Sequence, residues 1–366
     1  MAAQRGSAKA RRNRKLIVFG VELVIIAIMV VALIFVIRSG EESEGPIIAS
    51  VEDLAPEEIG ISQEVQELIE EGGSMSGYLN IAFFGIDALS TGTNDLLKGY
   101  RSDCIMICSI NQDTGDVKLC SVYRDTYLNL GNDKYSKCNA AYAKGGAQQA
   151  ISMLNSNLDM DITNWVSVSY KALSEAIDDL GGVYIDVDGE EIKHINSYQS
   201  CIADILKTDY VPVKDTGYQL LNGIQAAAYC RIRYTAGDDF KRTERQREVL
   251  KSMVDQAKKA SPAALTKVFN HVMDDVYTSL DSDTITELLS NITKYNIVAE
   301  NGFPEESMRA TGTIGAAGSC VIPRDLQSNV IWLHKFLFDD EAYVPTSTVQ
   351  GNSAKIASDT GKYLGQ

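Results

Sequence analysis

The stretch that decides the fold is YLNIAFFGID, residues 78–87, an apolar run of strand length that ends in a glycine and an acid. Two more apolar runs follow, DCIMICSIN at 103–111 and VKLCSVY at 117–123, with the turn sequence DTGD between them. Short runs rich in β-branched and aromatic residues, bounded by turn residues, are typical of buried strands. We therefore expect the second and third runs to form a β-hairpin.

Beyond this region, patterns typical of helices alternate with patterns typical of strands. Apolar residues recur at helical spacing after Gly146, and the paired glycines Gly181 and Gly182 end the helical stretch KALSEAIDDLGG. Further helices are expected in residues 221–233, 239–260, 262–280, 282–297 and 329–338, and strands in residues 165–170, 183–189 and just before the last helix. This alternation predicts an α/β fold, with α/β/α layers around a central mixed sheet.

The N-terminal part has the pattern of a membrane anchor. Residues 16–37 read LIVFGVELVIIAIMVVALIFVI, which is long enough to cross the hydrocarbon of a bilayer as a helix. Residues 1–15 are rich in basic residues, whereas acidic residues follow the apolar run. The positive-inside rule therefore places residues 1–15 in the cytoplasm and the chain after the apolar run outside. A cleavable signal peptide is the alternative, but its apolar run is shorter and ends at a small-residue cleavage site.

The chain after the anchor divides into three parts by composition. Residues 38–76 are acidic and carry glycines and serines near their end, which is typical of an extracellular juxtamembrane spacer. The folded domain is expected over residues 77–345, with its motifs in 78–260. Residues 346–366 form a polar tail, which we expect to be disordered from Ser347 onward.

Composition excludes two classes of protein. The net charge of −15 and the pI near 4.7 argue against general nucleic-acid binding, which requires positive surfaces. The seven cysteines are an odd number without CxxC spacing, so they predict neither a disulfide framework nor a zinc site.

Charged residues recur where the predicted strands end. Asp87 closes the first strand, Arg101 and Asp103 open the second, and Arg124 and Asp125 follow the third. Two neighbouring carboxylates at strand ends can hold a divalent cation such as Mg²⁺, which prefers hard oxygen ligands and keeps waters that a phosphate can replace. Asp87 and Asp103 are therefore the candidate metal ligands.

A second group of charged residues accompanies two predicted helices. Arg231 and Arg233 point the same way if their segment is extended, and Arg242 and Gln246 share one helix face at i and i+4, with Asp239 just before them. Arginine binds phosphate oxygens bidentately, so several arginines beside two acids suit a metal-bound pyrophosphate. Each pair taken alone is more typical of a surface salt bridge, but their repetition at several element ends favours a site.

Other chemistries have little support. His194, His271 and His334 are scattered and form no cluster with serine or cysteine, which argues against a hydrolase triad. The sequence contains neither a GxxxxGK[ST] loop nor a strand–GxGxxG–helix unit, which argues against nucleotide use.

Six of these segments carry a resemblance to a known family. In order and spacing, they resemble the motifs of the LytR-CpsA-Psr family of cell-wall glycopolymer ligases: NIAFFGID, YRSDCIMICSI, SVYRDTYL, KCNAAYAKGG, LLNGIQAAAYCRIR and DFKRTERQREVL. The resemblance covers about residues 78–260 and implies an α/β/α domain outside the membrane. It also implies an apolar cavity for a polyprenyl tail, arginines for its pyrophosphate, and Mg²⁺ (or Mn²⁺) on the acids.

The resemblance assigns roles by motif position. It implies that Asp87 and Asp103 bind the metal and that Asp125 and Asp239 support the arginines. The residues implied to contact the pyrophosphate are Arg101, Arg124, Arg231, Arg233, Arg242 and Gln246, and those implied in catalysis are Asp103, Arg124, Arg231 and Arg233. The chain departs from the family pattern at Tyr123, where Pro commonly precedes the Arg-Asp pair, at Lys241, where Gly is usual, and at Ala88 and Leu89.

The expected reaction is transfer of a glycan phosphate from a polyprenyl-pyrophosphate carrier to a peptidoglycan hydroxyl, with Asp103 ahead of Asp125 as the base. Hydrolysis of the same carrier lipid is the alternative within enzymes, and a non-catalytic glycan-binding or regulatory membrane protein is the alternative outside them. The sequence leaves open whether Ile151, Leu154, Leu173 and Ile177 form core or lipid contacts.

Overall fold

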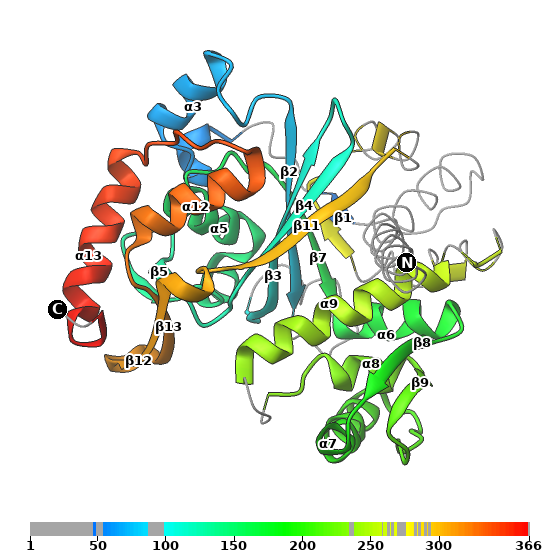
Figure 1. The fold of residues 1–366 in the computed structure, drawn as a ribbon. Coiled ribbons are helices and arrows are strands. Elements are labelled where there is room, and N and C mark those ends of the chain that lie inside the picture. The colour runs from blue at the N-terminus through cyan, green and yellow to red at the C-terminus, as the bar shows by residue number, and fades with distance from the viewer. Residues whose placement is uncertain are drawn as a thin grey trace, which may run out of the picture.

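A central mixed sheet organises the protein in a computed structural model (Figure 1). The structure describes residues 47–48, 54–86, 99–233, 238–257 and 294–364, with short stretches between 259 and 291. Within these residues the sheet has seven strands in the order β1-β10-β7-β2-β3-β4-β11. Their bounds are β1 Ile47–Ile48, β2 Tyr78–Ile86, β3 Ser102–Asn111, β4 Asp116–Val122, β7 Asn164–Ser169, β10 Val276–Thr278 and β11 Asn296–Phe303.

Pairing directions confirm the predicted mixed sheet and hairpin. Strands β3 and β4 are antiparallel neighbours joined across the DTGD turn, and β2 is antiparallel to β3. Strand β2 is parallel to β7 and β4 is parallel to β11. The register pairs Ile86, at the end of β2, with Ser102, which precedes Asp103. The strand ends that carry the predicted site therefore meet at one edge.

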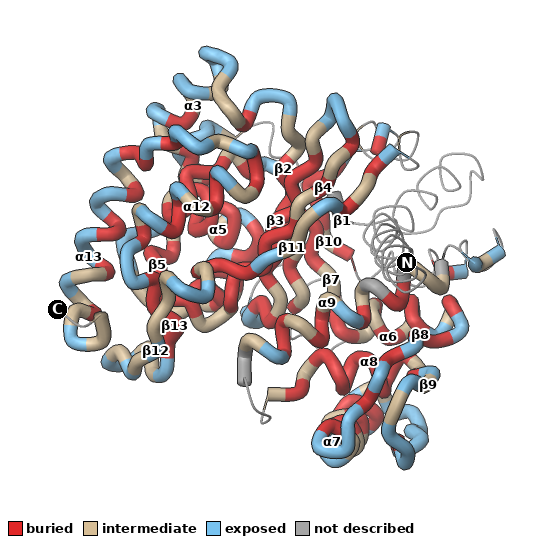
Figure 2. Tube along the Cα trace, viewed as in Figure 1, coloured by how far each residue is buried: buried red, intermediate tan, exposed pale blue. Residues whose placement is uncertain are grey.

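Alternation along the strands divides the core into two clusters. On β2, Ile81 faces one cluster, whereas Ala82, Phe84 and Ile86 face the other. Successive side chains of a strand point to opposite faces, so a strand that is apolar at nearly every position is buried on both sides. Figure 2 shows the buried residues concentrated on the central strands and the helix faces that cover them.

Helices cover both faces of the sheet (Figure 1). The helices with buried residues in the cluster around Phe84 are α3 Gln63–Glu70, α5 Ala140–Leu158, α12 Leu326–Phe338 and α13 Ser347–Leu364. Those with buried residues in the cluster around Ile81 are α6 Tyr170–Asp179, α7 Gly189–Leu206, α8 Gly223–Tyr229 and α9 Asp238–Ala257. Small two-stranded sheets add β5 Tyr127–Asn129 with β6 Tyr135–Lys137, β8 Val183–Val187 with β9 Gly217–Leu221, and β12 Arg309–Ile314 with β13 Gly318–Pro323.

Local signals explain where two helices begin and end. Helix α5 is broken at Gly145 and Gly146, where Gly146 has φ 67°, so its regular part starts where the sequence pattern starts. Ser169 caps the start of helix α6, because its hydroxyl accepts a hydrogen bond from the Ala172 amide. Gly181 and Gly182, both with positive φ, follow the helix. The amide of Gly182 donates back to Ile177, which closes the helix as the paired glycines predicted.

The expected spacer is partly folded. Residues 56–59 form a 3-10 helix, α3 follows, and Ile59, Ile61 and Met75 are buried in the cluster around Phe84. The prediction that folding starts at residue 77 was therefore wrong. The apolar residues of this acidic segment are few, so its composition resembled that of a linker, although these residues are buried in the cluster around Phe84.

The prediction of a disordered tail was also wrong, because Ser347–Leu364 forms helix α13. Val349 and Ile356 are buried, but polar contacts hold much of the rest. The Asn352 amide nitrogen donates to the Ser156 carbonyl at 2.9 Å, and its oxygen accepts from the Tyr135 hydroxyl at 2.6 Å. A helix that packs largely through amide and hydroxyl side chains has few apolar residues at helical spacing. The sequence of this segment therefore suggested disorder.

Two further expectations need correction. Residues 276–278, placed at the end of a helix by their pattern, form strand β10, which pairs antiparallel with β7. The region before α12 holds β11, β12 and β13, although one strand was expected. Residues 1–37, with the expected membrane anchor, lie outside the described residues, and no helix among the residues described is long and apolar enough to span a membrane.

Candidate active site

An apolar pocket lies between the sheet and helices α6 and α9. It encloses about 920 Å³, including the part open to solvent. Its lining includes Phe83 and Ile86 of β2, Met106 of β3, Leu173 of α6 and Leu250 of α9. Of the four residues left open by the sequence, Leu173 lines this pocket, whereas Ile151, Leu154 and Ile177 are core residues.

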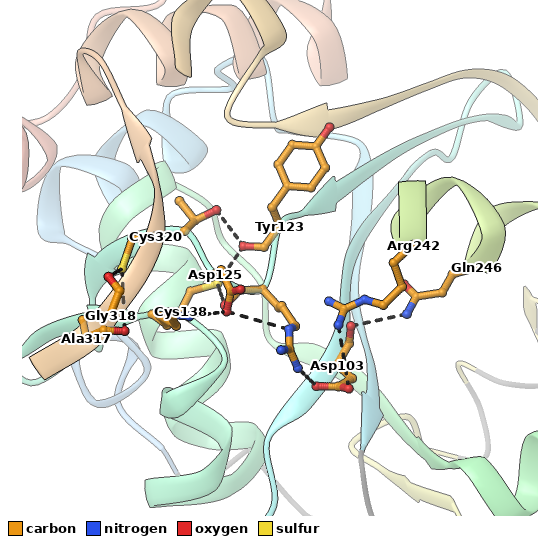
Figure 3. Close-up of polar contacts among 12 residues, drawn as sticks. Asp103, Tyr123, Asp125, Cys138, Arg242, Gln246, Ala317, Gly318 and Cys320 are labelled. Atoms are coloured by element: carbon orange, nitrogen blue, oxygen red, sulfur yellow. Dashed lines mark hydrogen bonds and ion pairs between the residues drawn. The ribbon is translucent and has the colours of Figure 1, made fainter. Parts of the chain in front are cut away.

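Asp103 lies at the edge of this pocket, next to Cys104, which lines it. One carboxylate oxygen of Asp103 accepts a hydrogen bond from Nη1 of Arg124, and the other lies 4.0 Å from Nη1 of Arg242. Gln246 Nε2 donates to the Asp103 carbonyl at 3.4 Å, and Gln246 also lines the pocket. Figure 3 shows Arg242 and Gln246 directed from their helix toward Asp103.

Helix α9 delivers Arg242 and Gln246 to the same point, as their i and i+4 spacing predicted. The Arg242 side chain is only 1% exposed, which is rare for a cation and requires anionic or hydrogen-bonding neighbours. The next arginine of the helix, Arg245, points elsewhere and pairs with Glu191 at 2.6 Å. Arg242 and Gln246 thus lie on one side of α9, and Arg245 lies on another.

A turn after β4 positions Arg124. The Arg124 carbonyl accepts the Asn139 amide at 3.1 Å and the Cys138 thiol at 3.3 Å, which ties the turn to the segment before α5. Asp125 lies 3.8 Å from Arg124 Nε and 3.1 Å from Lys137 Nζ. Asp125 is therefore placed to support Arg124, and Lys137 is a charged neighbour that sequence reasoning missed, although it stands directly before the KCNAAYAKGG motif's cysteine.

Arg231 lies on aromatic neighbours. Its guanidinium carbon is 5.3 Å from the ring centre of Tyr170, a pocket residue, and 5.7 Å from that of Tyr198. Ile232 is fully buried between the half-buried Arg231 and Arg233. The segment thus anchors on Ile232 and keeps both arginines partly accessible.

The structure brings four of the predicted residues together, namely Asp103, Arg124, Arg242 and Gln246, with Asp125 behind Arg124. Arg101 is exposed two residues before Asp103. Asp87 and the side chain of Asp239 lie outside the described residues.

The sequence profile of the LytR_cpsA_psr family matches residues 51–332. The chain belongs to this family. Among curated relatives, the polyisoprenyl-teichoic acid–peptidoglycan teichoic acid transferase TagV of Bacillus subtilis is 28% identical over 206 residues, which cover 55% of this chain and 49% of that protein. TagU of Halalkalibacterium halodurans, named as the same kind of transferase, is 31% identical over 196 residues, which cover 52% of this chain and 59% of that protein. The chain thus spans about half the length of these relatives.

Two solved structures share the fold. A Streptococcus agalactiae protein aligns with TM-score 0.58 and 21% identity, covering 77% of this chain and 94% of that one. TagT, in a structure described as bound to LI-WTA, aligns with TM-score 0.52 and 20% identity, covering 79% of this chain and 92% of that one.

Tyr123, one of the positions at which the chain departs from the LytR-CpsA-Psr pattern, contacts residues of other elements. Tyr123 packs edge-on against Phe240 of α9, with ring centres 4.7 Å apart, and its hydroxyl accepts a hydrogen bond from Arg309 Nη1 at 2.9 Å. The Arg309 guanidinium carbon lies 3.8 Å from the centre of the Phe240 ring. Burial raises the pKa of Tyr123, which keeps this hydroxyl protonated. Arg309 is distant in sequence from every motif, so no local pattern pointed to it.

Six of the seven cysteines of this LytR-CpsA-Psr domain are buried or half-buried, and Cys201 is exposed. All seven are free, and Cys104 and Cys108 line the apolar pocket. Burial raises the pKa of Cys104 to about 11 and also raises that of Cys230, so both stay thiols at neutral pH.

Proposed function

We propose that this protein transfers a phosphorylated glycan from a polyprenyl-pyrophosphate carrier to peptidoglycan. The observation that carries the proposal is the convergence of Arg124, Arg242 and Gln246 on Asp103 at the edge of an apolar pocket. A polyprenyl-pyrophosphate has the matching two parts, an apolar tail and a charged head. Guanidinium forks suit phosphate oxygens, and apolar side chains from β2, β3, α6 and α9 suit the tail.

The relatives support the same class of reaction. TagV and TagU are named as transferases that move teichoic acid from a polyisoprenyl carrier to peptidoglycan. The match to the family profile, residues 51–332, contains the residues that we place in the site. Another relative is named Biofilm regulatory protein A, so the relatives' names alone do not decide between catalysis and regulation.

In the proposed reaction, an acceptor hydroxyl oxygen attacks the phosphorus attached to the glycan. A new P–O bond forms, the bond from that phosphorus to the bridging oxygen breaks, and polyprenyl phosphate leaves with the electron pair. The acceptor proton passes to a carboxylate, for which Asp103 is the first candidate and Asp125 the second. Arg101, Arg124, Arg231, Arg233 and Arg242 would stabilise charge on the transferring and leaving phosphates.

Mg²⁺ (or Mn²⁺) is a further part of the proposal, with Asp103 and Asp87 as its ligands. Among the described residues, no group of three or more His, Cys, Asp or Glu side chains could hold a metal ion. Asp103 would contribute carboxylate oxygens, which are the hard donors that Mg²⁺ prefers. The cation would act as a Lewis acid toward the pyrophosphate oxygens.

The test is reconstitution with the full chain, because truncation at residue 77 would remove buried Ile59, Ile61 and Met75. The protein is incubated with a defined polyprenyl-pyrophosphate glycan, Mg²⁺ and peptidoglycan, and the products are identified. A glycan phosphodiester on peptidoglycan supports transfer. Free glycan phosphate, formed equally without peptidoglycan, would identify a pyrophosphatase instead, and an unchanged carrier would favour a binding or regulatory protein.

A further inference from the structure

A second hollow lies on the side of α9 that faces the β8–β9 hairpin. It encloses about 1390 Å³, including its open part, and polar side chains line most of it. Tyr184 and Asp186 of β8 and Tyr218 of β9 form one wall, and Glu244, Arg245 and Ser252 of α9 form the other. Gln246 and Leu250 line the apolar pocket, so α9 separates the two sites.

Two tyrosines form an open aromatic surface in this groove. The register pairs Asp186 with Tyr218, which makes Tyr184 and Tyr218 diagonal neighbours on one face of the hairpin. Their rings are stacked, with centres 5.4 Å apart and planes at 17°. The tyrosines are 41% and 74% exposed. The opposite face of the hairpin buries Val183, Ile185 and Leu221, so the exposed pair is held on a fixed support.

Buried contacts also fix the base of the groove. Arg245 Nε lies 2.6 Å from Glu191, and both side chains are about 95% buried, since their exposures are 5% and 6%. The Tyr229 hydroxyl donates to Glu248 at 2.7 Å, and the Tyr184 amide donates to the Ser252 hydroxyl at 2.6 Å. A groove whose walls are hydrogen-bonded to each other needs little ordering when a ligand binds.

The chemistry of the lining selects one class of ligand. Aromatic faces pack against the C–H faces of sugar rings, and carboxylates and serine hydroxyls bind sugar hydroxyls. The lining contains seven acidic side chains and three basic ones. This balance opposes a polyanionic glycopolymer, because like charges in a groove repel. An uncharged glycan meets no such penalty.

We infer that this groove binds the acceptor, a strand of uncharged glycan, during transfer. The inference rests on the proposed function, which requires a donor and an acceptor to meet. One contact links the two sides of α9: Arg245 Nη1 donates to the Ile232 carbonyl at 3.4 Å, and Ile232 stands between Arg231 and Arg233. The base of the groove is thus bonded to the segment that we assign to the pyrophosphate.

The test measures glycan binding directly, without transfer. The full chain in detergent micelles is titrated with a β-1,4-linked N-acetylglucosamine hexamer by calorimetry. We expect Tyr184→Ala and Tyr218→Ala each to weaken binding about tenfold, the loss typical of a tyrosine at the centre of an interface. Tyr210→Ala is the matched control, because Tyr210 is 39% exposed and lies outside the groove. Equal affinity in the wild type and both groove variants would overturn the inference.

Two further measurements separate the acceptor from other ligands. If a polyanionic teichoic acid binds as tightly as the hexamer and loses affinity in the same variants, the groove binds donor polymer and the inference is wrong. If phospholipid vesicles bind through Tyr184 and Tyr218 whereas the hexamer does not bind, the tyrosines contact membrane and the inference is wrong again. Hexamer binding that depends on both tyrosines, in a protein that transfers nothing, would instead support the groove and contradict the proposed function.

Discussion

Asp103 is the residue on which the candidate site is built. Its side chain is about 10% exposed and lies between two guanidinium groups, those of Arg124 and Arg242. A substitution of Asp103 is therefore expected to change both the stability of the fold and the rate of the reaction. Removing its charge leaves two cations without their shared carboxylate in a poorly hydrated place, and it also removes the first candidate for the base.

We expect Asp103→Asn to lower the free energy of unfolding by about 3 kcal/mol, as breaking a buried ion pair does, and to reduce transfer at least about 100-fold. Asp125→Asn is the comparison for stability alone, since its partner Lys137 is more exposed and the loss of this pair should cost about 1 kcal/mol. Urea unfolding and transfer rates check both numbers. Wild-type activity in Asp103→Asn would remove Asp103 from the mechanism.

Arg231 gives a second prediction at this scale. Arg231→Lys keeps the charge but loses the planar fork and its packing over Tyr170 and Tyr198. If the guanidinium binds phosphate, kcat/KM should fall about 10 to 150-fold, which corresponds to about 1.5 to 3 kcal/mol. Arg324→Lys, at an exposed arginine at the end of β13, should leave kcat/KM unchanged. Reduced thermal stability with normal kcat/KM in Arg231→Lys would mean that Arg231 serves only the fold.

At the scale of elements, α9 separates three environments. Arg242 and Gln246 approach Asp103, Leu250 lines the apolar pocket, and Arg245 lies in the polar groove. A contact on a fourth side joins α9 to the sheet, where Arg247 Nη1 donates to the Ser121 hydroxyl at 3.3 Å.

We expect Leu250→Trp to fill part of the apolar pocket. The KM for a long-chain polyprenyl-pyrophosphate donor should rise about tenfold, roughly the value of one or two displaced methylene contacts. A donor with a short prenyl chain should show a smaller rise, because it needs less of the pocket. Val298→Trp, on the exposed side of β11, is the control. Equal KM values for the long-chain donor in wild type and Leu250→Trp would show that the tail binds elsewhere.

Sequence patterns predicted the elements whose packing is apolar and local. The continuous apolar run of β2 and the turn between β3 and β4 identified the sheet, and the spacing of Arg242 and Gln246 identified their shared direction. Helix α13 was missed because Asn352 docks it through hydrogen bonds. Arg309 was missed because only the folded chain brings it to Tyr123.

At the scale of the whole molecule, one expectation concerns where the protein works. The basic residues before residue 16 and the acidic residues after 38 predict that the folded domain lies outside the membrane. A reporter enzyme that works only outside the membrane should then be active when it is fused after Gln366. A reporter enzyme that works only in the cytoplasm should be inactive at the same position. The opposite result would reverse the topology and remove access to peptidoglycan.

Stability of the whole fold should depend on pH through His334. This histidine of α12 is fully buried, with Nε2 2.9 Å from the Leu158 carbonyl of α5 and its ring stacked on Tyr343 at 3.5 Å. Because the ring faces a carbonyl oxygen, Nε2 carries the proton of the neutral form. Burial lowers the pKa of His334 from 6.5 to about 4.

Between pH 4 and 6.5 the unfolded chain therefore binds a proton at His334 that the folded chain does not. The stabilisation is complete above pH 6.5 and is lost as the pH falls toward 4, with a slope of at most about 1.4 kcal/mol per pH unit. His334→Gln keeps a donor for the Leu158 carbonyl but cannot titrate, so it should be less stable than wild type at pH 7 and approach it in acid. All other titratable groups are the same in both proteins, so the difference between the two isolates His334. Urea unfolding of both proteins from pH 4 to 7.5 measures that difference, and a constant value across this range would show that His334 does not link folding to protonation.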